Sequence, residues 1–205
     1  MKRSQKRSDA HISRRTVIAG ATLIPITAIQ AAPQQRAAAA TPATVFSPEQ
    51  RRTLDAFIDR LVPTDELGPG AVDCGVAEYI DRSLADYLAS EKTAFLDGLA
   101  ALDAYARSSQ SSSFADLAPD RRDAVLTSID TGQVPNLRGF FNRTRRLTLE
   151  GMFSDPYYGG NKNFAGWDLI RYPGVRLAVA PEDQSMKTLP KPSRRGAYGD
   201  NQHGH

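Results

Sequence analysis

Residues 155–174 read DPYYGGNKNFAGWDLIRYPG, and the rest of the chain has to be arranged around this segment. It contains the only Trp of the chain, three of its seven Tyr and four of its fifteen Gly. Neither a regular helix nor a regular strand is typical of such a composition. Glycine permits backbone conformations that other residues avoid, and large aromatic rings need neighbours to cover them. We therefore predict a fixed, irregular segment that packs against another surface.

The sequence before this segment has a helical pattern. Ser47, Pro48 and Gln50 predict a helix start with a capping box, and Pro63 predicts where that helix stops. Residues at helical spacing predict four further helices. The first contains Val76, Ile80 and Leu84, and the second contains Phe95, Leu99 and Leu102. The third begins near Pro119 and contains Val125 and Ile129, and the fourth begins at about Leu137 and contains Phe140, Phe141, Thr144 and Leu147. No alternating strand pattern and no internal repeat is present, so we predict an all-α domain of about five helices.

Loops and a tail separate or follow the predicted helices. Residues 63–74 contain two Pro and two Gly, and residues 108–113 are mostly Ser, so both predict loops. The last stretch has three Pro and scattered charges without helical spacing, which predicts an extended or disordered tail. The expected organisation is a leader over residues 1–40, a helical domain over 41–175 and a tail over 176–205.

The first forty residues resemble an export signal. Basic residues come first, Arg14 and Arg15 follow, and an uncharged run then extends to Gln35. An Arg pair directly before the apolar run is typical of the twin-arginine pathway, which exports proteins already folded, although a chance pair in a basic tail is the alternative. Gly, Pro and polar residues interrupt the run, which disfavours a membrane-spanning helix. The small-residue sites that fit cleavage are Ala38–Ala40 and Ala31–Ala32.

Charge is distributed unevenly along the chain. The formal net charge is +3 and the isoelectric point is about 9.1, which taken alone would favour an acidic partner. Residues 1–40 hold seven Lys and Arg against one Asp, so they carry +6 and the remainder carries −3. A body with a negative excess lacks the basic surface that nucleic acids require, so we exclude nucleic acid as a partner.

Candidate catalytic and metal-binding residues are scarce in the predicted domain. The three His are His11, His203 and His205, so the stretch from Thr41 to Asp200 contains none. This removes the commonest general base and the commonest metal ligand. A single Cys cannot hold an iron–sulfur cluster or attach haem through a pair of thiols. We therefore predict no catalytic residues, no metal and no cofactor in this chain.

Carboxylates and the single Cys leave alternatives open. Asp155 and Asp168 would form an acid pair for hydrolysis only if the fold placed them across one cleft. Cys74 is either buried and inert, exposed as a free thiol, or joined to another subunit by a disulfide. Four acidic residues lie in or near the predicted loop over residues 63–74, and their oxygen atoms could bind a hard cation such as calcium. The simpler interpretation is that these carboxylates are solvated or cap helices. These acidic residues are Asp65, Glu66, Asp73 and Glu78.

Two motifs resemble a known family, the small subunit (subunit 3, or gamma) of gluconate 2-dehydrogenase. The late motif is GMFSDPYYGGN at residues 151–161, followed by Gly166-Trp167 and Tyr172-Pro173-Gly174. The early motif is Pro63-Thr64-Asp65 with Gly68-Pro69-Gly70-Ala71 and Gly75-Val76. The similarity covers roughly residues 13–175. Two residues depart from the family: Arg171 stands where Gly is frequent, and Cys74 where small residues are more usual.

The resemblance implies a subunit without a cofactor or catalytic residues of its own. Its implied partners are a large, FAD-dependent sugar or sugar-acid dehydrogenase subunit and a multihaem cytochrome c, which carries haem c and anchors the complex to the membrane. It also implies that the small subunit escorts the folded large subunit through the twin-arginine machinery to the periplasm, with Arg14 and Arg15 as the signal.

The late motif supplies the residues that we expect at the partner interface or in the packing of this segment. They are Asp155, Pro156, Tyr157, Tyr158, Gly159, Gly160, Asn161, Gly166, Trp167, Tyr172, Pro173 and Gly174. Whether the rings face the chain's own helices or the flavoprotein is open at this point. Two other classes of function also stay open: a stand-alone binding protein of the envelope, and an independent exported hydrolase that uses carboxylates.

Overall fold

Helices make up the regular structure of the chain. The computed structural model describes residues 44–176, 178–179, 181–184 and 190–198. Its α-helices are α1 (Pro48–Leu61), α2 (Val76–Ala85), α3 (Lys92–Gln110), α4 (Pro119–Asp130), α5 (Pro135–Phe153) and α6 (Ala165–Leu169). Its 3-10 turns are η1 (Ala89–Glu91), η2 (Phe114–Asp116), η3 (Pro156–Tyr158), η4 (Lys162–Phe164) and η5 (Pro181–Gln184). No strand occurs in these described ranges, which confirms the predicted all-α class.

The first helix begins and ends where its sequence predicts. The backbone N–H of Gln50 donates to Ser47 Oγ at 3.2 Å, and the N–H of Ser47 donates to Gln50 Oε1 at 2.9 Å, which completes the capping box. The helix ends at Leu61, two residues before Pro63. Capping and proline, both local effects, therefore set its limits.

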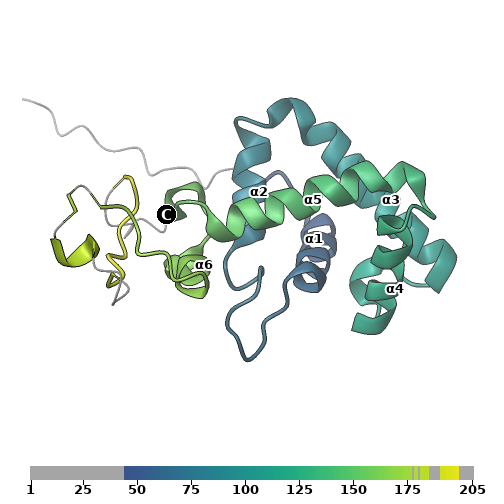
Figure 1. Ribbon diagram of the computed structural model, residues 1–205. Helices are drawn as coiled ribbons and strands as arrows, with labels where there is room; N and C mark the ends of the chain where they lie inside the picture. The colour runs from purple at the N-terminus through teal and green to yellow at the C-terminus, as the bar shows by residue number, and fades with distance from the viewer. Residues whose placement is uncertain (1–43, 177, 180, 185–189, 199–205) are drawn as a thin grey trace, which may run out of the picture. The chain divides into compact units, whose positions relative to one another are not determined.

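Helix α5 is the element that the others share. It contacts α1, α2, α3, α4 and α6, and Figure 1 shows α4 near one of its ends and α6 near the other. A close approach to α3 is possible because residue 98 is glycine: a Cβ there would lie 2.2 Å from Cδ2 of Phe140. None of the helices in the described ranges is both long enough and apolar enough to cross a membrane.

The core consists of two adjoining groups of buried side chains. One contains Leu54, Ile80 and Leu147 and lies mainly among α1, α2 and the later part of α5. The other contains Phe57 and Ile129 and lies among α1, α3, α4 and the first part of α5. Aromatic contacts link the two groups, because the ring centroid of Phe140 lies 5.8 Å from that of Phe57 and 5.3 Å from that of Phe95. The helices thus share one continuous interior.

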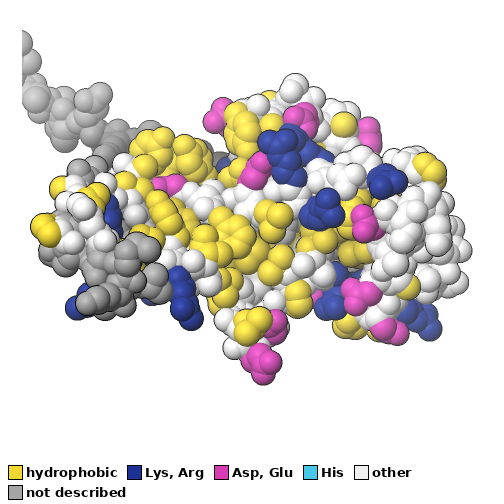
Figure 2. All heavy atoms as spheres, in the orientation of Figure 1, with side chains coloured by type: hydrophobic (Ala, Val, Ile, Leu, Met, Phe, Trp, Pro, Cys, Tyr) yellow, Lys and Arg dark blue, Asp and Glu magenta, His cyan; other side chains and the backbone are white. Residues whose placement is uncertain are grey.

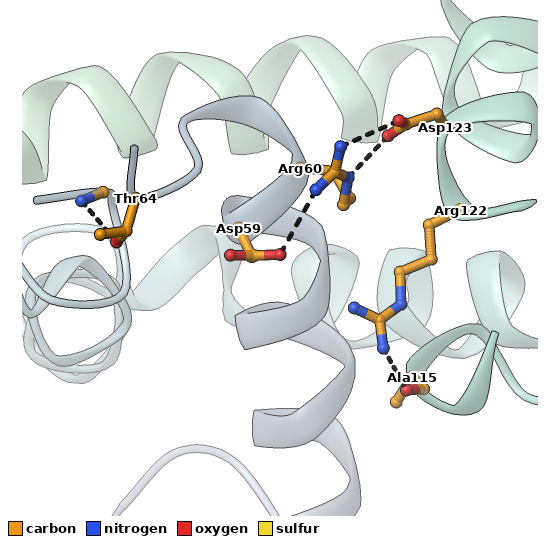
Figure 3. Close-up of polar contacts among 7 residues, drawn as sticks. Asp59, Arg60, Thr64, Ala115, Arg122 and Asp123 are labelled. Atoms are coloured by element: carbon orange, nitrogen blue, oxygen red, sulfur yellow. Dashed lines mark hydrogen bonds and ion pairs between the residues drawn. The ribbon is translucent and has the colours of Figure 1, made fainter. Parts of the chain in front are cut away.

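An ion pair connects the first helix to the fourth. Arg60 donates through Nε and Nη2 to the two carboxylate oxygens of Asp123 at 2.7 and 2.9 Å, and Figure 3 shows this two-pronged contact. These hydrogen bonds hold the pKa of the Asp123 carboxyl below its usual range. In the same view Arg122 donates to the carbonyl oxygen of Ala115 at 2.6 Å. Polar contacts therefore fix α4 beside α1 and η2.

One predicted loop is partly helical. Residues 108–113 were expected to form a loop, but α3 continues to Gln110. The hydroxyl groups of Ser108 and Ser109 donate to the carbonyl oxygen of Tyr105, the preceding turn, at 2.9 and 2.8 Å, which satisfies them within the helix. The residue that follows the helix, Ser111, is its C-cap and adopts a left-handed φ of 61°. The prediction was wrong for the first three residues of this stretch.

Candidate partner interface

The segment that follows α5, residues 155–174, forms a compact irregular unit that we call the clasp. It contains two 3-10 turns and α6, which is five residues long. This short helix accounts for the sixth α-helix where about five were expected. Asn161, Asn163 and Phe164 have positive φ, as does Arg171, so repeated left-handed residues break the backbone direction. The predicted irregular conformation is therefore produced by several non-glycine residues as well as by glycine.

Asn161 holds the clasp together from its centre. Its side chain is fully buried. The Nδ2 atom donates to the carbonyl oxygen of Ser154 at 2.9 Å, and Oδ1 accepts from the N–H groups of Gly166 at 2.9 Å and Trp167 at 3.2 Å. One side chain thus ties the end of α5 to the first turn of α6, and it satisfies three backbone groups that are otherwise without secondary-structure partners.

Two glycines of the clasp permit a close approach to the end of α5. A Cβ at residue 160 would lie 2.1 Å from the carbonyl oxygen of Gly151, and one at residue 166 would lie 1.8 Å from that of Met152. Neither distance is compatible with a side chain of any size. Gly160 and Gly166 are therefore required for packing.

Trp167 faces the interior of the chain. It is 6% exposed, and its Nε1–H donates to the carbonyl oxygen of Phe153 at 2.8 Å. Its ring packs 5.4 Å from that of Phe164 and 4.8 Å from that of Tyr172, measured between centroids. The backbone N–H of Tyr172 donates to the Trp167 carbonyl at 2.8 Å. Of the two roles expected for this residue, structural packing is the one that the geometry supports.

The tyrosines of η3 face outward. Tyr157 and Tyr158 are 54% and 44% exposed, and their rings lie 5.3 Å apart in an edge-on arrangement. Tyr198, from the C-terminal stretch, stacks 4.2 Å from Tyr157 and forms a hydroxyl–hydroxyl hydrogen bond of 3.1 Å with Tyr158. That hydrogen bond raises the pKa of Tyr158. On the face shown in Figure 2, hydrophobic side chains gather over the end of α5 that leads toward α6.

Residues 193–198 of the tail lie against the clasp. Backbone bonds join Val175 N to the Arg195 carbonyl at 3.0 Å and Ser193 N to the Pro173 carbonyl at 2.7 Å. Glycine is favoured at residue 174, because its φ is 85° and a Cβ would lie 2.4 Å from Ser193 Oγ. Residues 190–195 form no helix, and the tail's one described helical turn is η5.

The two acidic residues of the clasp also hold the tail. Asp155 caps η3 by accepting from Tyr157 N at 3.0 Å, and it accepts from Ala197 N at 2.6 Å. Asp168 pairs with Arg194 at 2.6 Å. Each carboxylate therefore has a structural role in positioning this stretch.

The early loop, residues 63–74, meets the clasp. Lys162 N donates to the carbonyl oxygen of Cys74 at 3.0 Å. A Cβ at Gly68 would lie 2.6 Å from Cδ2 of Leu169, so the loop packs closely on α6. Within the loop, Gly70 N donates to Thr64 Oγ1 at 2.9 Å, a contact drawn in Figure 3. The early motif and the late motif thus form one structural unit.

The acidic side chains in the early loop and at the start of α2 mostly accept hydrogen bonds from nearby donors. Asp65 Oδ1 accepts from Leu67 N at 2.8 Å, Asp73 accepts from the Thr64 hydroxyl at 2.5 Å, and Glu78 pairs with Arg82 at 2.9 Å. The described ranges contain no group of three or more His, Cys, Asp or Glu side chains that could hold a metal ion.

Cys74 is buried, with 0% of its surface exposed. Burial, with a smaller contribution from Asp73, raises the pKa of its thiol to about 11. The reactive thiolate is therefore scarce at neutral pH. These properties favour the inert-thiol alternative, since an intersubunit disulfide would require the side chain to leave this position.

Arg171 has a left-handed backbone with a φ of 55°. This is the position at which the resemblance expected Gly, and a side chain there strains the backbone. We predict that Arg171→Gly raises the free energy of unfolding by about 0.5–1 kcal/mol, a gain limited by the greater freedom of glycine in the unfolded chain. Urea denaturation measures the change. Arg171→Ala is the control, because it removes the side chain but keeps the Cβ; an equal gain in both variants would contradict the backbone explanation.

The clasp is thus a closely packed unit built on the end of α5 and on the early loop. The family model for gluconate 2-dehydrogenase subunit 3 matches residues 48–174, more than half of the chain. The chain belongs to the gluconate 2-dehydrogenase subunit 3 family. No curated protein and no solved structure matches it.

The region that defines membership of the gluconate 2-dehydrogenase subunit 3 family begins with α1 and ends at the last residue of the clasp. Both motifs that carried the resemblance lie inside it. The family is a subunit of a gluconate dehydrogenase complex, and its name implies other subunits as partners. Arg14 and Arg15, predicted as the export signal, lie outside the described residues.

Proposed function

We propose that this chain is the non-catalytic small subunit of a membrane-associated, flavin-dependent sugar or sugar-acid dehydrogenase complex. In this proposal it binds the large flavoprotein subunit, which carries FAD, and escorts it through twin-arginine export to the periplasm. A multihaem cytochrome c completes the complex and joins it to the membrane. The single observation that carries the proposal is the family match over residues 48–174.

The exposed side of the clasp is the surface through which the flavoprotein binds in this proposal. Tyr157, Tyr158 and Tyr172 each expose more than two fifths of their surface, and tyrosine is enriched where proteins bind one another. The buried contacts of Asn161 and Trp167 hold the backbone beneath these rings. A surface already fixed in its bound shape loses less conformational freedom on association, which favours affinity.

The export step is tested with the Arg pair. Replacing Arg14 and Arg15 by Lys in the full-length chain should lower periplasmic dehydrogenase activity at least about tenfold, because the pair is the predicted address for the exporter. The large subunit should then accumulate in the cytoplasm. Cell fractionation, with activity and immunoblots for both subunits, measures the effect.

The control for this experiment is Arg7→Lys combined with Arg36→Lys. It makes the same substitution twice within the leader but outside the pair, and it should leave periplasmic activity at the level of the original chain. Normal periplasmic activity in the Arg14→Lys, Arg15→Lys variant would contradict the escort role.

A further inference from the structure

A pocket opens between α1, the start of α2 and the clasp. Its volume is about 430 Å³. Three cationic side chains line it, each from a different element: Arg51 from α1, Arg82 from α2 and Lys162 from η4. The main chain of Gly75 and Gly159 contributes to the same wall. We call this site the basic pocket.

The cations of the basic pocket keep hydrogen-bond donors available. Arg51 and Arg82 each use Nε to bind a carboxylate one helical turn away, Asp55 at 3.0 Å and Glu78 at 2.9 Å. Within the described ranges, the terminal amino groups of these two guanidinium groups and the ammonium of Lys162 have no hydrogen-bond acceptor. Both Arg side chains are only 40% exposed, so the remaining donors lie partly sheltered from water, where charge-assisted bonds are stronger.

The electrostatic setting of the pocket is unlike that of the chain around it. Outside its first forty residues the chain has an excess of three negative charges, yet the pocket lining holds three cations and one carboxylate, Glu78. Helix α2 begins at this wall, and its N-cap Gly75 provides no side-chain cap. The positive end of the helix dipole adds to the attraction for an anion. The lining is therefore suited to a negatively charged group.

Two glycines shape the wall on which such a group would rest. Gly75 and Gly159 both have positive φ, 73° and 99°. A Cβ at residue 159 would lie 2.9 Å from Cδ and Nε of Arg82, so only glycine leaves this guanidinium in place. A Cβ at residue 75 would meet the Lys162 side chain at 3.6 Å, which is ordinary contact. Glycine at residue 159 is thus what leaves room for one of the three cations, Arg82.

We propose that the basic pocket receives an acidic side chain, Asp or Glu, of the large flavoprotein subunit. A protein suits the pocket better than a free anion, because two of its lining residues, Pro156 and Gly159, directly flank the exposed Tyr157 and Tyr158 in the sequence. Because the rings and this wall of the pocket belong to consecutive residues, one partner surface can cover both. The inference rests on the proposed function and adds the chemistry of the partner: a carboxylate beside a surface that accepts tyrosine rings.

The test uses the two subunits expressed together, with a tag on this chain. Arg82→Glu combined with Lys162→Glu should lower the amount of co-purified flavoprotein at least about tenfold at 150 mM salt, since reversing charges at a close ion pair turns attraction into repulsion. Arg107→Glu combined with Arg146→Glu is the matched control. It makes the same change in net charge and breaks two i,i+4 Arg–carboxylate pairs like that of Arg82, but outside the pocket. The control should co-purify with the flavoprotein normally.

Each further result has a defined meaning. Circular dichroism and thermal melting establish that both variants are folded, and the milder Arg82→Gln, Lys162→Gln variant should show an intermediate loss if the reversal variant is unstable. Equal recovery of flavoprotein with folded pocket and control variants would overturn the proposal. A second result would also overturn the proposal. In it, calorimetry shows that sodium gluconate binds to the original chain but not to the pocket variant, while co-purification is unchanged. The pocket would then hold a small anion. Failure of the original chain to co-purify with any flavoprotein would instead contradict the proposed function.

Discussion

Gly166→Ala should lower the free energy of unfolding by about 3–5 kcal/mol, toward the upper end of what single substitutions do. The added Cβ would lie 1.8 Å from the carbonyl oxygen of Met152. That oxygen belongs to the backbone of α5, so no change of side-chain rotamer relieves the overlap. The first turn of α6 would have to move away, which breaks the hydrogen bond from Gly166 N to Asn161 and uncovers Trp167. Overpacking and loss of burial then act together.

Chemical denaturation and thermal melting measure this change, and we expect the melting temperature to fall by about 10 °C or more. Gly139→Ala in α5 is the matched control. A Cβ at residue 139 meets nothing within 4 Å, and the residue is exposed in a helix. Alanine is the better helix former, so this variant should gain up to about 1 kcal/mol. A Gly166→Ala variant as stable as the original chain would show that the clasp does not hold its position on α5.

Asn161→Ala has the second largest expected effect, a loss of about 3–4 kcal/mol. The substitution removes three hydrogen bonds and leaves the N–H groups of Gly166 and Trp167 and the carbonyl of Ser154 without their partner. Buried polar groups without partners cost about 1–3 kcal/mol each before the structure relaxes. The left-handed backbone at residue 161, with a φ of 46°, adds a further penalty for alanine.

The control for this variant is Asn163→Ala. Asn163 has the same left-handed backbone, with a φ of 56°, but it is exposed and its side chain makes no hydrogen bond among the described residues. Its loss should stay at or below about 1 kcal/mol, the backbone part alone. Urea titrations of both variants separate the two contributions. Similar losses at the two positions would mean that the Asn161 side chain does not hold the clasp.

Local rules predict the helices of this fold well. The capping box at Ser47 and the stop at Pro63 define α1, and helical spacing places the cores of α2 to α5, because burial requires one apolar face on each helix. The serines after Arg107 were misread since a serine composition is typical of loops, while their hydroxyl groups can also bond back to the preceding turn.

The interior of the clasp is less predictable. Its glycines and aromatic rings indicate an irregular packed segment, but nothing local shows that Asn161 would be its buried centre, since asparagine is usually exposed. Nor does the sequence indicate that the early loop would meet η4, because that contact joins residues far apart in the chain. The basic pocket was missed for the same reason: Arg51, Arg82 and Lys162 come from three elements and share no sequence motif. Tyr198 was missed because it lies in a stretch without any helical or strand pattern.

The bond from Lys162 N to the Cys74 carbonyl has a consequence for the order of events in folding. Contacts between distant parts of a chain form late, because the intervening chain must first lose its freedom. The helices can form early from local interactions, but the tyrosine rings and the cations of the basic pocket reach their positions only when the early loop and the clasp have both been synthesised and joined. If these groups bind the partner as we propose, we expect partner recruitment to report that folding is complete. A half-made chain would carry the helices and yet lack the proposed docking surface.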